Sequence, residues 1–411
     1  MSGEASPKLL RKRLEATVVS GNAPNAKERD LHEGRMASDM MDLMLAREAH
    51  SRVIKVLFDA HQLGRRQTGN ETYVRELLRS FGRRKNLDVV AAVEHDNALD
   101  GLLPPNQMRR VPNNGVGRLL KLSRLARQEN VDLLHAIYFL PWLAGRPSVL
   151  TVHDISFELY PEFFSRSALL RDRLLIRASA RRATRVITVS NASRMDLVER
   201  YGLPENKVVV APNGVSERFR PDEHLVWAPY TGDRPLRILA VGTLQPRKNL
   251  VRLIDAVSLV GQRLPVELRV VGPDGHDAGV IRRRLSKTVD AAAVGWLSEG
   301  DLLREYRAAD VFAYPSIYEG FGLPVLEAMA CGTPVVTSTG GSLPEVAGDA
   351  AKVVDPFDVE ALAGAILSIA EDPASARSLR ARGLERAAQF TWERSAAVHV
   401  AVYRDLVGRP Q

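Results

Sequence analysis

The chain of 411 residues has a single cysteine, Cys331. One thiol excludes an internal disulfide and any zinc site built from several cysteines. Chains without disulfides are typical of reducing compartments, so we expect a cytoplasmic protein.

Long apolar runs are also lacking. No stretch of the sequence approaches the roughly 18 uninterrupted apolar residues that a membrane-spanning helix needs. The first residues contain no apolar segment of the kind found in secretion signals. We therefore expect a protein that is soluble or that binds a membrane surface peripherally.

Hydrophobic residues make up 45% of the sequence, which is enough for two domains of up to about 200 residues and excludes disorder throughout. The formal net charge is +8, which favours anionic partners such as nucleic acid, anionic lipid or phosphorylated small molecules. The sequence carries no nucleic-acid-binding motif and no interleaving of aromatic with basic residues. We therefore expect no nucleic acid partner.

Short β-branched runs alternate with amphipathic segments twice along the chain. Residues 1–50 show no clean period and predict a mobile extension, whereas 51–220 contain runs such as "RVIKVLFDA", "LDVVAAV" and "SVLTVHD". The alternation breaks at 216–235, a predicted linker, and a second series with "RILAVGT", "VELRVVG" and "VFAYPS" fills 221–390. This pattern predicts two α/β domains with parallel, doubly wound sheets, followed by a helix in 391–411.

Parallel sheets of this kind bind ligands at the carboxyl ends of their strands, and "EGFGLPVLE" at 319–327 directly follows a predicted strand. Gly320 and Gly322 lack a Cβ, so the backbone there can approach a ligand closely or adopt a positive φ. Pro324 suits the start of a helix, whose first N–H groups would face the ligand and favour phosphate.

The two acids of this segment predict hydroxyl ligands. Glu319 precedes the turn, and we expect Glu327 in the first turn of the helix. An acid beside a diphosphate is repelled unless it accepts hydrogen bonds from hydroxyl groups, so a ribose for Glu327 and a hexose for Glu319 would satisfy both. An acid favourable at a helix N-terminus plus an ordinary loop glutamate explains the spacing equally well.

Basic and polar residues elsewhere are further candidates. Arg247 and Lys248, in "VGTLQPRKNL", match two phosphate oxygens, although a solvated surface pair is the alternative. Gly69 and Asn70 are predicted in a flexible loop that opens a helix and could close over phosphates. The alternative is a plain helix cap formed by Asn or Thr. His153 ends the predicted strand in "TVHD", where a histidine beside an acid is a candidate functional group and otherwise a structural one.

The segment "SRSALLRDRLLIRASARRATR" holds seven arginines between positions 166 and 185, interleaved with leucines. One face of such a helix could lie on anionic lipid, which suits an enzyme with a lipid-linked acceptor. The alternative is a solvated helix that packs on the sheet.

The segments "RKN", "EGFGLPVLEAMACGTPVV", "TVHD", "VSNASRMDL" and "APNGV" together closely resemble the retaining nucleotide-sugar glycosyltransferases of glycosyltransferase family 4. The resemblance runs from about Arg52 to the last residue, and the pair Glu319 and Glu327 is its most specific part. The segments "HDISFELYPEFF" and "TGNETYVRELL" are most similar to mannosyltransferase-type members that build polysaccharides and glycolipids. Residues 1–50 match nothing in the family pattern.

The resemblance implies two facing Rossmann-like domains, the B-type glycosyltransferase fold. The acceptor side lies in 51–220, the nucleotide-sugar donor binds in 221–390, and a helix in 391–411 crosses back to the first domain. By position, Arg247 and Lys248 stabilise the diphosphate and Glu327 holds the ribose. Glu319 orients the transferred sugar together with the backbone amides of Gly320, Phe321, Gly322 and Leu323. His153 lies near the reacting face of the sugar. Gly69 and Asn70 lie near the phosphates. The loop at Gly69 lacks the second glycine that many relatives have.

The implied reaction is retaining transfer from a nucleoside-diphosphate sugar, with GDP-mannose favoured, to a hydroxyl of a glycan or lipid-linked acceptor. We expect front-face attack, because no facing carboxylates of the glycosidase kind are evident. The sequence has no Asp-x-Asp, so we expect no metal and no other cofactor. The enzyme would be cytoplasmic and peripheral on the inner face of the plasma membrane.

Three other functions are alternatives. A nucleic-acid-binding protein would use the basic charge but is disfavoured, because no recognised motif supports it. A nucleotide-sugar epimerase of similar architecture would form product without an acceptor. An oxidoreductase is disfavoured because no Gly-x-Gly-x-x-Gly follows a predicted strand.

Overall fold

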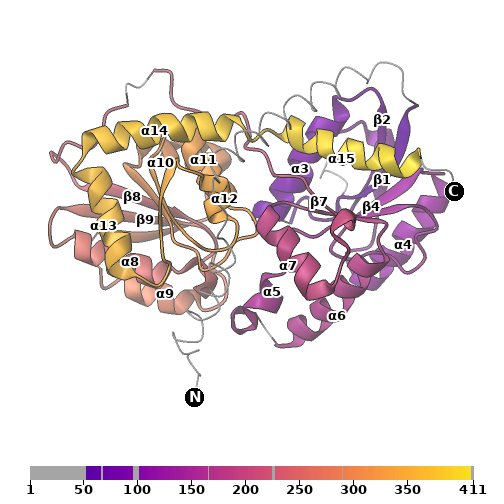
Figure 1. Ribbon diagram of the computed structural model, residues 1–411, viewed down its shortest axis with the longest axis horizontal. Coiled ribbons are helices and arrows are strands. Elements are labelled where there is room, and N and C mark those ends of the chain that lie inside the picture. The colour runs from indigo at the N-terminus through magenta and orange to yellow at the C-terminus, as the bar shows by residue number, and fades with distance from the viewer. Residues whose placement is uncertain are drawn as a thin grey trace. The chain divides into compact units, whose positions relative to one another are not determined.

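The computed structural model describes residues 52–65, 68–95, 101–164, 166–224, 227–288 and 290–408. The predicted extension 1–50 lies outside these residues. Residues Lys55 to Gln411 form one compact unit, which contains two parallel sheets with their helices (Figure 1). The prediction of two Rossmann-like α/β domains is confirmed.

The first sheet has seven strands in the order β3-β2-β1-β4-β5-β6-β7. Its order reverses between β1 and β4, which is where ligands bind in such sheets. Helices α4, α6 and α7 cover one face, and α3 lies on the other (Figure 1). The strands are β1 (Ile54–Asp59), β2 (Leu87–Val93), β3 (Met108–Arg110), β4 (Leu133–Ile137), β5 (Ser148–Thr151), β6 (Arg185–Thr188) and β7 (Val208–Val210). The helices are α3 (Thr68–Gly82), α4 (Gly115–Gln128), α5 (Ser156–Leu159), α6 (Arg166–Arg182) and α7 (Asn191–Tyr201).

The second sheet has six strands in the order β10-β9-β8-β11-β12-β13, which reverses between β8 and β11. Helices α8, α9 and α13 lie on one face, and α10, α11 and α12 lie on the other (Figure 1). The strands are β8 (Leu236–Val241), β9 (Val266–Val271), β10 (Ala291–Gly295), β11 (Val311–Tyr314), β12 (Val335–Ser338) and β13 (Ala351–Val354). The helices are α8 (Leu250–Val260), α9 (Ala278–Leu285), α10 (Glu299–Ala308), α11 (Leu323–Cys331), α12 (Leu343–Ala347), α13 (Val359–Ala370) and α14 (Pro373–Ala388).

Burial explains why the strands read as apolar runs. Every residue of β4, β5, β11 and β12 is buried, as expected for strands of a parallel sheet covered on both faces. The polar residues therefore gather beyond the carboxyl ends of these strands. The described residues of the predicted linker 216–235 contain no helix or strand.

The last helix of the described chain, α15 (Trp392–Val407), packs against α3 of the first domain. Its buried polar groups complete a hydrogen-bonded network there. His399 Nε2 lies 2.8 Å from the Tyr73 hydroxyl, and Tyr403 OH lies 2.5 Å from His135 Nδ1. These contacts show what α15 packs against, but they do not show where either domain ends. The predicted domain boundaries at residues 220 and 390 therefore stay predictions.

Candidate functional site

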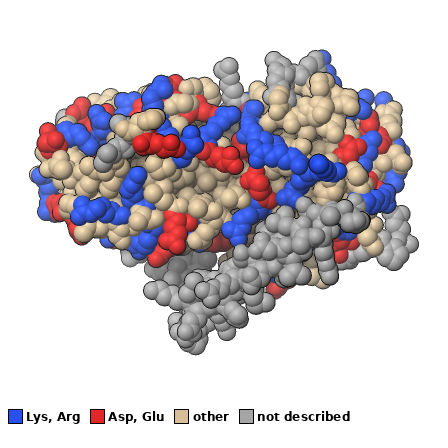
Figure 2. Space-filling model, turned by 90° about the horizontal axis from the view of Figure 1, so that it is seen from above, with Lys and Arg blue, Asp and Glu red and all other residues tan. Residues whose placement is uncertain are grey.

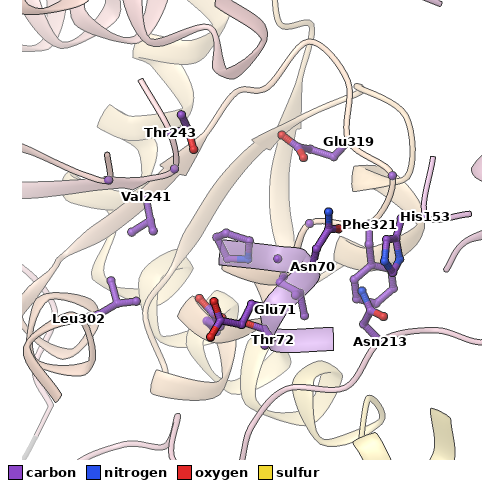
Figure 3. A pocket seen from close by; sticks show the side chains of 18 of the residues that line it. Asn70, Glu71, Thr72, His153, Asn213, Val241, Thr243, Leu302, Glu319 and Phe321 are labelled. Atoms are coloured by element: carbon purple, nitrogen blue, oxygen red, sulfur yellow. The ribbon is translucent and has the colours of Figure 1, made fainter. Parts of the chain in front are cut away.

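A cavity of about 1790 Å³ is lined by residues of both domains. Figure 3 shows side chains from α3, from the segment after β5 and from the second domain around it. All of the predicted site residues line this one cavity: Gly69, Asn70, His153, Arg247, Lys248, Glu319, Gly320, Phe321, Gly322, Leu323 and Glu327. Residues of the predicted linker line it as well, among them Arg218 and Arg220. The structure thus brings the candidates together, while their roles stay proposals.

The two cations and the first acid form one largely buried cluster. Arg247 and Lys248 end a short 3-10 helix, Pro246–Lys248, after β8, and the next residue has a positive φ of 58°. The Glu319 carboxylate lies 3.0 Å from Arg247 Nη1 and 2.7 Å from Lys248 Nζ. Lys248 Nζ also donates to the Tyr314 hydroxyl at 2.5 Å. Sequence reasoning missed Tyr314, although a tyrosine at the carboxyl end of a buried strand could have indicated it.

Within this cluster the two cations outnumber the Glu319 carboxylate, while the Asp154 carboxylate of the cavity wall also attracts both cations. Burial alone would raise the pKa of Glu319, but Arg247 and Lys248 lower it to about 2, so the carboxylate is ionised at neutral pH. Burial lowers the pKa of Lys248, and the contact of Lys248 with Glu319 partly counteracts this effect. Two cations face one carboxylate, so the cluster can accept a further anion when Glu319 turns to another partner.

The second acid lies deeper in its helix than we expected. Glu327 is the fifth residue of α11 and so belongs to its second turn, which corrects the expectation of a first-turn position. Its carboxylate accepts a hydrogen bond from the Tyr306 hydroxyl at 2.7 Å. Burial raises the pKa of Glu327 to about 7. No sequence pattern indicated Tyr306, because its contact with Glu327 is made between helices.

The Gly-Phe-Gly turn needs both glycines, for different reasons. Gly322 has φ of 107°, a conformation that residues with a side chain rarely adopt. Gly320 is packed against the first domain: a Cβ there would lie 2.7 Å from the Asp154 carboxylate. The prediction of a positive φ is confirmed for Gly322. At Gly320 the close approach is to Asp154 of the first domain, so the predicted approach to a ligand stays a prediction.

First-domain residues contribute neutral polar groups. His153 follows β5, and burial lowers its pKa to about 4, so its imidazole is neutral at pH 7. Its Nε2 and the Asn213 Oδ1 are buried and have no hydrogen-bond partner within the described ranges. Such unpaired atoms on a cavity wall are suited to hydroxyl ligands. Asn213, in "APNGV", was not predicted as a site residue.

Gly69 and Asn70 lie inside the first turn of α3, which begins at Thr68, and not in a loop before it. They still line the cavity, as Figure 3 shows for Asn70. Among the described residues there is no group of three or more His, Cys, Asp or Glu that could hold a metal ion.

The arginine-rich segment forms α6 and leaves leucines on the outside. Leu170 and Leu174 are about two-thirds exposed, at 65% and 64%, whereas Ile176 is buried and lines the cavity. Nearby, Arg182 lies 4.7 Å above the ring of Trp142, which is itself 71% exposed. We call the exposed set the arginine-leucine surface: Trp142, Leu143, Leu170, Leu174 and Leu175 with Arg171, Arg177 and Arg182.

Elsewhere the charges are mixed. Figure 2 shows both basic and acidic side chains over the face that it presents, with a group of adjacent basic side chains near its middle. Within the described ranges, no helix is long and apolar enough to cross a membrane.

Comparison with known proteins identifies relatives of both halves. Residues 68–219 match the family model described as Glycosyltransferase Family 4, and 228–386 match the one described as Glycosyl transferases group 1. The chain is 33% identical over 283 residues to O-antigen chain mannosyltransferase B of Escherichia coli, which covers 65% of this chain and 72% of the relative. It is 32% identical over 283 residues to the MMP alpha-(1->4)-mannosyltransferase of Mycolicibacterium hassiacum. This match covers 64% of this chain and 67% of the relative.

Solved structures share the fold. Sucrose-phosphate synthase from Thermosynechococcus elongatus superposes with a TM-score of 0.70 at 24% identity, over 86% of this chain and 99% of that one. HepE of Anabaena, crystallised with UDP and glucose, superposes with a TM-score of 0.67 at 21% identity, over 87% and 100%. At these identities the likeness concerns the fold alone.

Proposed function

The chain belongs to glycosyltransferase family 4, and from this premise we propose that it transfers mannose from GDP-mannose to a hydroxyl group with retention of anomeric configuration. The acceptor would be a glycan or a lipid-linked molecule. One observation carries the proposal: Arg247, Lys248, Glu319 and Glu327 line a single cavity in which two buried cations share one carboxylate.

In the proposed reaction, the diphosphate takes the place of Glu319 beside the two cations. Glu319 then accepts hydrogen bonds from hydroxyls of the transferred sugar, and Glu327 accepts them from the ribose. The bond from the anomeric carbon to the diphosphate breaks, and a bond to the acceptor oxygen forms on the same face. The acceptor proton passes to the departing phosphate oxygen.

Fixed donors that face the departing phosphate supply the main catalytic effect. Each such donor typically stabilises the transition state by roughly 3 to 4 kcal/mol, or about a hundredfold or more in rate. Arg247 and Lys248 fit this role because Glu319 holds both of them, and Tyr314 holds Lys248, in place before the donor arrives. Glu319, with its low pKa, is a poor base and better suited to orienting hydroxyls.

Two observations favour GDP-mannose as the donor. Relatives at 32 to 33% identity carry the names of mannosyltransferases. At the cavity wall, Glu299 begins α10 near Trp296 and forms an ion pair with Arg218. Guanine offers two adjacent N–H donors that match a carboxylate such as that of Glu299. Uracil has a single N–H between two carbonyl oxygens, and these oxygens repel a carboxylate.

The arginine-leucine surface supports a lipid-linked acceptor and a location on the inner face of the plasma membrane. Its leucines and tryptophan would enter the headgroup region while its arginines pair with anionic lipid. Arg171 and Ile176 of the same helix line the cavity, so a bound membrane would lie beside the acceptor side of the site.

The test is a donor and acceptor panel with the purified full chain. We expect GDP-mannose to be consumed in preference to UDP-sugars, with an α-linked product visible by NMR only when a glycan or lipid-linked acceptor is present. EDTA should not reduce the rate, and GDP should inhibit about tenfold more strongly than inosine diphosphate, which lacks the guanine amino group.

Three outcomes of this panel would contradict parts of the proposal. An isomerised sugar formed without acceptor would indicate an epimerase. Loss of activity with EDTA that magnesium or manganese restores would refute metal independence. Preference for a UDP-sugar would overturn the donor assignment and leave the glycosyl transfer intact.

A further inference from the structure

Two serines of the first domain hold a carbonyl group of the donor loop, which we define as residues 319–322. Ser190 Oγ donates to the Gly320 carbonyl at 2.7 Å, and Ser193 Oγ donates to the same oxygen at 3.3 Å. Both serines are fully buried. Ser190 also accepts from the Ser193 N–H at 3.0 Å, so its hydroxyl caps α7 and binds the donor loop at once.

A third serine, from the second domain, holds the neighbouring carbonyls. Ser342 Oγ donates to Phe321 O at 2.8 Å and approaches Glu319 O at 3.0 Å, and its N–H donates to Glu319 O at 3.0 Å. The carbonyl groups of three consecutive residues of the donor loop are therefore fixed by hydroxyl groups of serines.

The direction of a carbonyl sets the direction of the next N–H, because the two point to opposite sides of a planar trans peptide. Fixing Gly320 O therefore fixes the N–H of Phe321 on the opposite side of that peptide. The N–H groups of Gly320, Phe321 and Gly322 have no acceptor within the described ranges, while these residues line the cavity. These groups are free to donate to a ligand.

Further contacts join the start of α7 to the same part of the second domain. Glu345 accepts from the N–H of Asn191 at 2.9 Å and from that of Ala192 at 3.3 Å. The Tyr318 hydroxyl, next to the donor loop, donates to Asp196 at 2.5 Å. The start of α7 is thus joined to the donor loop through Ser190 and Ser193, and to the neighbouring Tyr318 and Glu345 through further hydrogen bonds.

We propose that Ser190 and Ser193 are positioning residues, which aim the Phe321 N–H at the transferred sugar through the Gly320 carbonyl. The inference rests on the proposed function, because it concerns the sugar site of the donor. The sugar site is complete only while α7 is docked on the donor loop. Binding of the nucleoside diphosphate, which depends on Arg247, Lys248 and Glu327, does not require this contact.

The test compares Ser190→Ala/Ser193→Ala with the full natural chain. We expect kcat for transfer to fall about tenfold to a hundredfold, because a small misplacement of the reacting groups has effects of this size. The dissociation constant of GDP should change by less than about twofold. A matched control is Ser258→Ala, which removes a similar bond to the Ile254 carbonyl within α8 and should alter neither quantity.

Loss of the helix cap lowers the stability of the double variant, so melting temperature is measured in parallel and Ser193→Ala serves as a second variant with the cap intact. For Ser193→Ala we expect a smaller fall in kcat, of about threefold or more, with GDP affinity unchanged. The inference is overturned if both variants have the same kcat as the natural chain. It is also overturned if GDP affinity falls by the same factor as kcat. Absence of transfer in the natural chain contradicts the proposed function instead.

Discussion

Glu319 has one set of partners in the described structure and another in the proposed reaction. Its carboxylate lies within 3.0 Å of both cations, and in the proposed reaction the diphosphate displaces it. Two largely buried cations that share the Glu319 carboxylate can still attract a further anion. A single ion pair in the same place would bind a diphosphate less strongly, because its charges cancel.

At this scale we predict opposite effects of two substitutions. Glu319→Gln should lower kcat about a hundredfold while GDP binds at least as tightly, because the cations lose their competing partner. Arg247→Ala should weaken GDP and GDP-mannose alike, by about tenfold or more. Calorimetry and steady-state kinetics measure these quantities.

The matched control is Glu305→Gln, which breaks an ion pair with Arg269 away from the cavity and should change neither constant. Equal losses of kcat and GDP affinity in Glu319→Gln would assign the residue a structural role. Unchanged GDP affinity in Arg247→Ala would remove it from the phosphate site.

Among the helices, α6 combines a buried side with an exposed apolar side. Leu169 and Ile176 pack into the core, whereas Leu170, Leu174 and Leu175 are exposed. An exposed leucine adds little to stability, so three of them on one basic helix are better explained by a surface that they contact.

We predict that Leu170→Ser/Leu174→Ser/Leu175→Ser abolishes binding to liposomes that contain anionic lipid while melting temperature stays unchanged. The natural chain should sediment with anionic liposomes and not with neutral ones. A control variant, Leu120→Ser, changes an equally exposed leucine on α4 and should sediment like the natural chain. Sedimentation of the triple variant at natural levels would exclude the arginine-leucine surface as the contact.

Local patterns predicted most of these elements. The sheets followed from apolar runs, and the helix after the Gly-Phe-Gly turn followed from Pro324, which is the second residue of α11. The sequence could not reveal the contact between Ser190 and Gly320, which lie 130 residues apart. A serine before a helix indicates a cap, but its second hydrogen bond depends on how the domains pack.

For the molecule as a whole, buried histidines connect acid stability to the packing of α15. Burial lowers the pKa of His153 and of His399 to about 4, and it lowers that of His135 well below its usual range. The folded state therefore requires neutral imidazoles. Their contribution to stability is complete above the unfolded pKa of about 6.5 and is lost as pH falls toward 4.

We predict that melting temperature falls between pH 6.5 and 4.5, since His153 and His399 each contribute up to about 3 kcal/mol over the full range and His135 acts in the same sense. The raised pKa values of Asp196 and Glu327, about 6 and 7, act in the opposite sense and reduce the net effect. His399→Gln should flatten the curve, as measured by calorimetry. A melting temperature independent of pH in the natural chain would contradict this account.

The first domain is not a continuous stretch of the chain, because α15 supplies buried partners for Tyr73 and His135. A fragment cut after β7 would lack that helix and expose these polar groups, so the two halves cannot be produced separately by one cut. During synthesis, the domain that is translated first is completed only when α15 has left the ribosome.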